Sequence, residues 1–357
     1  MFTMKILHSA DWHLDAPFQG HSPEKQQFLK ESLLRVPGKI ATICRQENCD
    51  MVLLSGDLFD GAYTRDSYQA VYQALEEMQV PVFVTPGNHD YVCMTSPWSK
   101  ESWPDNVTVF KEQALTCVQA AGCRIWGAGY IAMEAPAMLK GFHAEEGEGY
   151  AIGILHADTA RAKSPYCPVT SKQIKDSGLH YLALGHIHKG DSLQAGDTLC
   201  AWPGCPMGRG YDEPGEKGVL IVELDETVTT RFVPLDVPRF FDLEVEPEED
   251  PVAAVGSLLP AVGNEDFYRI TLTGPSEPVD MAALQAEFAN FPNLVLRDRT
   301  VAPVDPWCAV GEDSFEGLYF SLLQKNLDSQ DPQQQRITQL AAKISRQLLD
   351  GREVKLP

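Results

Sequence analysis

Residues Met51–Asp60 read MVLLSGDLFD, and this stretch indicates the fold of the chain. Its first four residues are apolar, which is enough for one short buried strand. The strand is followed by Ser55 and Gly56, then by Asp57 and, three residues later, by Asp60. Open α/β sheets bind their ligands beyond the carboxyl ends of their strands. We therefore expect the two carboxylates to lie at the rim of a sheet, at a functional site.

Four other segments repeat this design of an apolar strand followed by Asp, Asn or His. They are ILHSADWH (residues 6–13), FVTPGNHD (83–90), AIGILHAD (151–158) and ALGHIH (183–188). Where the chain leaves a strand, residues two apart can point to the same side, so Asp-x-His and His-x-His can direct both side chains into one pocket. Carboxylate, amide and imidazole groups without a thiolate suit Mn, Fe or Zn better than Ca or a cysteine-rich zinc site. The pattern predicts a metal centre at the ends of several strands.

The composition limits the classes of protein that fit. The formal net charge of −21 argues against a protein that wraps a long phosphate backbone unaided, although carboxylates that hold cations can still bind phosphate through them. Nine cysteines without a C-x-x-C pair indicate reduced thiols, and the chain starts without a signal-peptide pattern. No apolar run reaches the roughly 18 residues of a membrane span. We therefore expect a cytoplasmic protein without a membrane segment.

Strands and helices alternate over the first 90 residues, which predicts parallel βαβ units. The expected strands are 5–8, 51–54 and 80–85, with a helix from about Pro23 to Glu47 that breaks at Val36-Pro37 and another over 65–78. Short runs at 107–110, 115–118 and 124–126 suggest antiparallel strands, and 150–155 and 181–184 are further apolar strands. We expect 198–202, 218–224 and 228–235 in a second sheet. Two sheets face to face, with helices outside, predict a four-layer α/β/β/α sandwich.

Prolines and an acidic run mark a domain boundary near residues 237–240. We predict a core over 1–238, a small α+β cap over 239–305 and a helical tail over 306–357. In the cap, strands 241–245, 268–272 and 294–296 alternate with helices 252–259 and 281–288; the tail holds helices 314–327 and 333–349. The last helix carries an apolar stripe of Ile337, Leu340, Ala341, Ile344 and Leu348. This stripe fits either packing on its own domain or docking of a partner.

The motifs DWH, GDLFD, GNHD, ILHAD and GHIH, in this order, resemble those of the calcineurin-like metallophosphoesterase superfamily over roughly residues 1–235. DWHLDAPF, SPWSKESWPDNVTVF and WPGCPMGRGYDEPGEKG resemble segments of its SbcD/YhaO group of DNA-repair exonucleases. GDLFDGA lacks the Arg that follows the second Asp in the Ser/Thr phosphatase branch, which counts against a phosphoprotein phosphatase.

The resemblance implies two divalent metal ions, with Mn²⁺ expected and Fe²⁺ or Zn²⁺ as alternatives. It places one ion on Asp11, His13, Asp57 and His188, and the other on Asp57, Asn88, His156 and His186. Asp57 would bridge the pair, as a two-metal clamp with ions roughly 3.5–4 Å apart requires. The implied reaction is activation of water by the two metals for in-line attack on phosphorus.

Further roles follow from the same resemblance. His89 would donate to a phosphate oxygen or protonate the leaving oxygen, and Asp60 is placed to orient it. Arg209 could bind a phosphate or make local ion pairs. Trp98 and Trp103 could stack on bases, although packing in the core is the stronger expectation.

Three functions from different classes are compatible with these residues. The leading one is a metal-dependent DNA exonuclease of the SbcD/YhaO type, whose relatives work with an SbcC-like coiled-coil ATPase and form dimers. Such a partner could supply the DNA-holding surface that a chain of net charge −21 lacks. The second is a phosphodiesterase or phosphomonoesterase acting on small nucleotides. The third is a non-catalytic docking subunit, against which the complete set of ligands argues.

Overall fold

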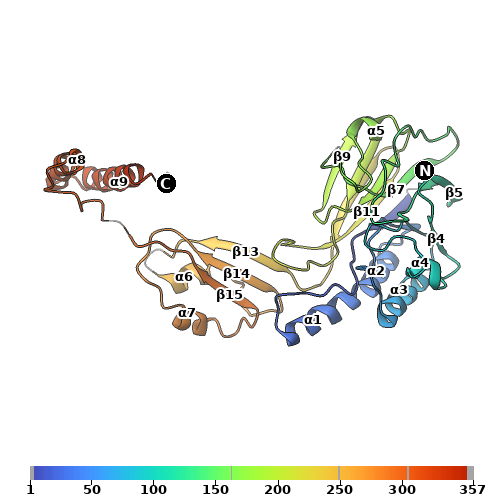
Figure 1. Cartoon of the computed structure of the whole chain (residues 1–357), viewed down its shortest axis with the longest axis horizontal. Coiled ribbons are helices and arrows are strands. Elements are labelled where there is room, and N and C mark those ends of the chain that lie inside the picture. Colours follow the sequence, from blue (N-terminus) through green and yellow to red (C-terminus); the bar gives the residue numbers. More distant parts are fainter. Residues whose placement is uncertain (1–3, 162, 248–249, 304, 352–357) are drawn as a thin grey trace. The chain divides into compact units, whose positions relative to one another are not determined.

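The computed structural model describes residues 4–161, 163–247, 250–303 and 305–351 (Figure 1). These residues form two compact units. The first contains the chain up to Phe241 together with Glu265–Phe267, and the second contains the remainder. In the described residues, no helix combines the length and the apolar character needed to cross a membrane.

Two six-stranded sheets form the first unit, in the orders β12-β11-β1-β2-β3-β4 and β5-β6-β7-β8-β10-β9. The strands of the first sheet are β1 (Met4–Ser9), β2 (Met51–Leu54), β3 (Val82–Val84), β4 (Val107–Val109), β11 (Gly218–Leu224) and β12 (Val228–Pro234). Those of the second are β5 (Thr116–Ala120), β6 (Cys123–Gly127), β7 (Tyr150–His156), β8 (Tyr181–Gly185), β9 (Asp191–Ala195) and β10 (Thr198–Trp202). All the strands expected in the core therefore form, and β9 is an additional one.

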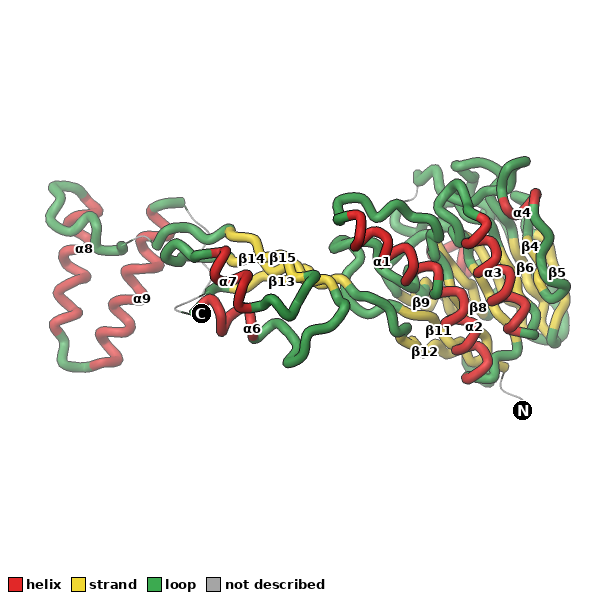
Figure 2. The backbone as a smooth tube through the Cα atoms, turned by 90° about the horizontal axis from the view of Figure 1, so that it is seen from below, coloured by secondary structure: helices red, strands yellow, loops and turns green. Residues whose placement is uncertain are grey.

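Helices α1 (Pro23–Leu34), α2 (Val36–Gln46) and α3 (Arg65–Met78) cover the outer face of the first sheet (Figure 2). Since alternate strand residues face opposite sides, Leu7 packs with these helices and Ile6 packs between the sheets. The outer face of the second sheet is covered by loops and by α5 (Ser171–Lys175), whose Ile174 is buried there. This arrangement is the predicted α/β sandwich, with a thin fourth layer.

Two expectations about the sheets are wrong. The strand β4 was expected to be antiparallel, yet it extends the first sheet by pairing parallel with β3. The strands β11 and β12 were expected in the second sheet, yet β11 pairs antiparallel with β1, and β12 pairs with β11. Apolar patterning predicts that a strand exists, but its partner depends on where the chain returns in space.

The second unit contains a three-stranded sheet in the order β13-β14-β15, in which β14 (Phe267–Leu272) and β15 (Leu294–Asp298) are parallel. The strand β13 spans Phe240–Val245, and two short helices, α6 (Pro251–Gly256) and α7 (Met281–Glu287), accompany the sheet. The expected strands and helices of the cap therefore form.

The tail forms α8 (Phe315–Gln324), a 3₁₀ helix (Lys325–Asp328) and α9 (Pro332–Leu349). Phe320 of α8 and Ala342 of α9 are buried against each other's helix, and Arg346 bonds Glu316 at 2.7 Å. Most of the apolar stripe is not buried: Ile337, Leu340 and Leu348 are 51, 40 and 62% exposed, whereas Ala341 and Ile344 are half-buried.

Candidate metal centre

The parallel order of β1, β2 and β3 brings the loops after these strands to one edge of the first sheet. The β1 loop runs along the β2 loop, because the Asp11 amide donates to the Gly56 carbonyl at 2.9 Å and the His13 amide donates to the Asp57 carbonyl at 3.0 Å. In the second sheet, β7 ends on His156 beside Gly185, the last residue of β8. The His186 amide then donates to the Asp11 carboxylate at 3.0 Å, which joins the two sheets at this edge.

Several of the predicted ligands have an uncommon backbone conformation. The φ angles of Asp11, His13, Asp57 and His186 are 54, 48, 54 and 88°. Residues other than glycine seldom adopt this left-handed region, and each instance costs on the order of 1–3 kcal/mol. Gly87 is needed for the same packing, since a side chain there would collide with the Asp57 carboxylate. These loops therefore keep unfavourable backbone conformations that place the side chains of the predicted ligands at the site.

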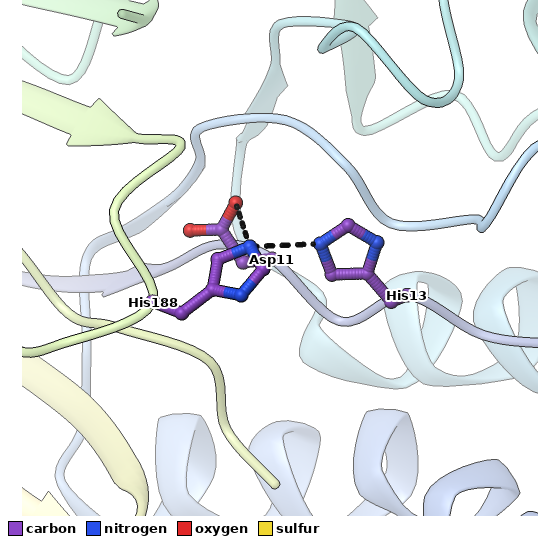
Figure 3. Close-up of side chains that lie close together, drawn as sticks. All are labelled: Asp11, His13 and His188. Atoms are coloured by element: carbon purple, nitrogen blue, oxygen red, sulfur yellow. Dashed lines mark hydrogen bonds and ion pairs between the residues drawn. The ribbon is translucent and has the colours of Figure 1, made fainter. Parts of the chain in front are cut away.

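One group of predicted ligands consists of Asp11, His13 and His188 (Figure 3). Nε2 of His13 lies 3.1 Å from Nε2 of His188, which lies 3.9 Å from an Asp11 carboxylate oxygen. The other nitrogen of each ring is also engaged: His13 Nδ1 lies 3.3 Å from Asp60, and His188 Nδ1 lies 2.6 Å from Glu213 and 3.0 Å from Arg209 Nη2. The two Nε2 atoms therefore lie close together beside the Asp11 carboxylate.

The second group surrounds His156, which is fully buried. Its Nδ1 donates to the Ser55 carbonyl at 2.9 Å, which leaves Nε2 to face Asn88 Oδ1 at 2.9 Å and Asp57 Oδ2 at 3.3 Å. His186 Nδ1 lies 3.2 Å from the same Asn88 oxygen. The same Asp57 oxygen lies 3.8 Å from His13 Nε2, so Asp57 stands between the two groups.

This donor set fits two divalent cations. All seven predicted ligands are brought together: Asp11, His13, Asp57, Asn88, His156, His186 and His188. Rings whose second nitrogen is fixed by a carboxylate or carbonyl are typical of metal-ligating histidines. A cation would also fit between the two ring nitrogens of His13 and His188, which lie 3.1 Å apart.

The charges in this cluster depend strongly on one another. Burial opposes ionisation of Asp57, yet His156 and His13 outweigh it and hold the pKa of the Asp57 carboxyl below its usual range. Burial likewise opposes protonation of His156, but the charge of Asp57 raises the pKa of His156 to about 9. Burial and the neighbouring His156 lower the pKa of His186 to about 4. The site is therefore a buried carboxylate cluster that attracts positive charge.

Comparison with known proteins decides the family. Residues 4–190 match the family model described as calcineurin-like phosphoesterase. The chain belongs to this family.

The relatives of this phosphoesterase include two from Bacillus subtilis. The uncharacterized metallophosphoesterase YhaO is 31% identical over 62% of this chain and 57% of its own length. The SbcD component of the SbcCD nuclease is 24% identical over 62% of this chain and 66% of its own. The chain thus spans less than two thirds of either relative. Among solved structures, a dimetal phosphatase from Danio rerio matches with a TM-score of 0.43 and 11% identity, covering 64% of this chain and 98% of that one.

The phosphoesterase places His89 at the open edge of its metal centre. His89 Nδ1 lies 2.8 Å from Asp60 Oδ1, and its side chain is 45% exposed. The hydrogen bond to Asp60 raises the pKa of His89 despite partial burial. Asp60 contacts His13 as well as His89, so this one carboxylate serves a predicted ligand and the predicted proton donor.

Glu213 is a site residue that the sequence patterns did not reveal. This carboxylate is 8% exposed, contacts His188 Nδ1 at 2.6 Å and accepts from Arg209 Nη2 at 2.9 Å. Arg209, which was predicted either to bind phosphate or to pair locally, therefore makes the local ion pair beside the metal centre. The only sequence signal for Glu213 is its spacing of four residues from Arg209 in GRGYDE.

The two tryptophans are packing residues. Trp98 is fully buried, and Trp103 stacks on it with ring centroids 5.0 Å apart. The expectation that they pack in the core is therefore confirmed for Trp98, and the alternative that bases stack on Trp98 is wrong.

Proposed function

We propose that this phosphoesterase is a metal-dependent phosphodiesterase that cleaves DNA and acts as an exonuclease in DNA repair. The observation that carries the proposal is the convergence of six oxygen and nitrogen ligands around a seventh, Asp57, with His89 at the open edge. Similarity to the SbcD component of the SbcCD nuclease supports DNA as the substrate class.

The ligands have distinct tasks in this proposal. Asp11, His13 and His188 hold one cation, Asn88, His156 and His186 hold the other, and Asp57 is shared. The two cations, when bound, supply the Lewis acidity that activates water and stabilises the charge on the phosphoryl oxygens. Mn²⁺ is the metal we propose, because carboxylate, amide and imidazole ligands suit it; Fe²⁺ and Zn²⁺ accept the same set.

His89 supplies the proton. Since its Nδ1 faces Asp60, its Nε2 is free to donate to a phosphoryl oxygen or to the leaving oxygen. Asp60 keeps His89 protonated to a higher pH than an isolated histidine, because the hydrogen bond between them raises the pKa of His89. Arg209 is held by Glu213 and adds positive charge beside His188.

Two features of this chain favour a partner protein: its negative net charge and the exposed apolar residues of its tail helices. A net charge of −21 leaves the binding of a long DNA backbone to another protein, for which we propose an SbcC-like coiled-coil ATPase, with a homodimer as the nuclease unit. The tail helices α8 and α9 are the proposed docking element. Besides the stripe on α9, α8 exposes the apolar residues Phe315, Leu318, Tyr319 and Leu322.

The acidity favours one alternative, hydrolysis of small nucleotides by a phosphodiesterase or phosphomonoesterase that needs no DNA-holding surface. A non-catalytic docking role is disfavoured, because docking gives no reason for seven converging ligands.

Digestion of linear DNA, circular DNA and a small phosphodiester in Mn²⁺, with and without the ATPase, tests the proposal. We expect cleavage of linear DNA, lost in Asp57→Ala and reduced about 10²–10⁴-fold in His89→Gln. Strong turnover of the small diester without any cleavage of DNA would establish the alternative instead.

A further inference from the structure

A cavity of about 520 Å³ opens beside His89 in the first unit. The loop after β2 lines it with Tyr63, the first residue of α3 lines it with Arg65, and the chain after β3 lines it with Tyr91 and Lys100. This volume lies within the range of about 300–1,000 Å³ that small-molecule sites occupy. His89 belongs to its wall, so the cavity lies next to the open edge of the candidate metal centre.

The cavity carries positive charge that is not committed elsewhere. Arg65 and Lys100 are exposed, and neither forms an ion pair within the described part of the chain. The two carboxylates that line the cavity are oriented by neutral hydrogen-bond donors, which leave their charge in place. Glu101 accepts the Tyr63 hydroxyl at 2.6 Å, and Asp90 accepts the Gly87 and Leu58 amides at 2.7 and 2.9 Å. In a chain of net charge −21, two free cations beside the proposed proton donor favour an anionic ligand.

The aromatic part of the wall is held in place. Tyr63 is fixed by Glu101 and packs edge-on against Phe59, with ring centroids 5.8 Å apart. Tyr68 donates to the Ser102 carbonyl at 2.6 Å. Tyr63, Tyr68 and Tyr91 are all half-buried, so each retains an exposed part. Fixed aromatic rings beside cations are the elements that single-stranded nucleic-acid sites combine, since a base can stack while its phosphate is neutralised.

We propose that this cavity binds the nucleotide on the leaving-group side of the scissile phosphate, with Arg65 and Lys100 on its next phosphate and a tyrosine ring against its base. This inference rests on the proposed function. Hydrolysis forms a P–O bond to water and breaks the P–O bond to the leaving nucleotide, whose oxygen takes the proton of His89. The cavity that His89 lines is therefore the space where the leaving nucleotide lies.

Replacing one phosphate of a short single-stranded oligonucleotide by a neutral methylphosphonate tests this site without altering the protein. On the wild-type enzyme, the replacement next to the scissile phosphate on the leaving side should lower kcat/KM about tenfold, and on the other side less. Arg65→Ala/Lys100→Ala should lower kcat/KM for the all-phosphate strand by a similar factor. In this variant the methylphosphonate should lower kcat/KM by less than a further twofold, because the two protein substitutions and the neutral phosphate analogue remove the same ionic contact.

Binding of the oligonucleotide can also be measured in the presence of a chelator, where no strand is cleaved. We expect the affinity to fall for the same substitutions that lower kcat/KM. Lys30→Ala/Lys140→Ala removes the same charge from exposed lysines outside the cavity and should match the wild type in both assays. A tenfold methylphosphonate effect in the Arg65/Lys100 variant, or no such effect in the wild type, would overturn the proposed nucleotide site in the cavity. Either result would leave the proposed cleavage of DNA standing. A wild-type enzyme that cleaves no oligonucleotide would overturn both the cavity and the proposed function.

Discussion

Glu213 is the residue that links the loop after β10 to the candidate metal centre. It fixes His188 through Nδ1 and also holds Arg209. Burial opposes its ionisation, but the bonds from His188 and Arg209 outweigh burial and hold the pKa of Glu213 below its usual range. A charged acceptor of this kind sets the tautomer of the ring and strengthens the other nitrogen as a ligand.

Glu213→Gln should weaken Mn²⁺ binding about 10–100-fold, because the amide replaces the charged acceptor of His188. Isothermal titration with Mn²⁺ measures this change directly. Glu216→Gln is the matched control, since Glu216 is exposed and pairs only loosely with Arg239 at 3.8 Å. Equal affinities in the two variants would show that Glu213 does not support the metal site.

His8 makes the stability of the chain sensitive to acid. It is fully buried between the sheets, with its ring nitrogens 2.7 Å from the Tyr181 hydroxyl and 2.8 Å from the Ser55 hydroxyl. Burial lowers the pKa of His8 to about 3. In the unfolded chain its pKa is about 6.5, so on acidification the unfolded state takes up this proton first. The contribution of His8 to stability is therefore complete above pH 6.5 and falls as the pH drops towards 3.

In His8→Gln, unfolding by urea at pH 7 and pH 5 should show a weaker dependence on pH than in the wild type. The difference should approach about 1.4 kcal/mol per pH unit in this range. Glutamine can still bond both hydroxyls but does not titrate. If the unfolding free energies of the wild type and His8→Gln, both measured in chelator, changed equally with pH, His8 would not be the source of the acid sensitivity.

The residues of the site differ in how well the sequence reveals them. The seven predicted ligands each follow an apolar strand, and parallel strands bring such ends together by geometry. Glu213 lies in a loop that does not directly follow an apolar strand, so no sequence pattern marks it. It gains a role only because the folded chain brings this loop next to His188. The same holds for Arg65 and Lys100, which stand at the ends of two different helices and come to one cavity only in the folded chain.

At the scale of elements, local patterns located the helices and strands better than their partners. The helix α3 and the strands β2, β10 and β11 have the predicted bounds. The sheet of β11 was nevertheless predicted wrongly, because its apolar run suits either sheet. Its place beside β1 is decided by long-range packing.

The tail helices yield a prediction about association. Leu340→Glu/Leu348→Glu should abolish capture of the SbcC-like ATPase, because two charges would enter the proposed apolar interface. The melting temperature of the isolated chain should hardly change, since both side chains are exposed. Gln339→Glu on the same helix is the control and should still bind. Loss of the folded state in the double variant would instead indicate that the stripe packs within this chain.

At the scale of the whole molecule, residues beyond the boundary proposed near residue 238 pack into the hydrophobic cluster of the core within the first unit. Arg239 bonds Asp266 at 2.7 Å, and Phe240 stacks on Phe267 with centroids 4.8 Å apart. Both phenylalanines belong to the hydrophobic cluster beneath the helices. Residues 240 and 267, which lie beyond the proposed boundary, therefore stabilise the predicted core.

A chain that ends at Pro238 should fold and bind Mn²⁺, because both sheets and all seven ligands precede this residue. Its unfolding free energy should be lower than that of the full chain, by an amount comparable with Phe267→Ala, for which we expect about 3–5 kcal/mol. Denaturant unfolding of the truncated chain and of this variant measures both. A truncated chain without cooperative unfolding would place the boundary elsewhere.

The number of Mn²⁺ ions bound per chain tests the two-metal centre most directly. Equilibrium dialysis with metal analysis should find two ions per wild-type chain and two in the exposed control Asp105→Ala. Asp57→Ala should bind fewer than one at the same free Mn²⁺ while keeping its circular dichroism spectrum, because in the proposed centre both ions would depend on the Asp57 carboxylate. A single ion in the wild type, or two ions in Asp57→Ala, would contradict the shared centre.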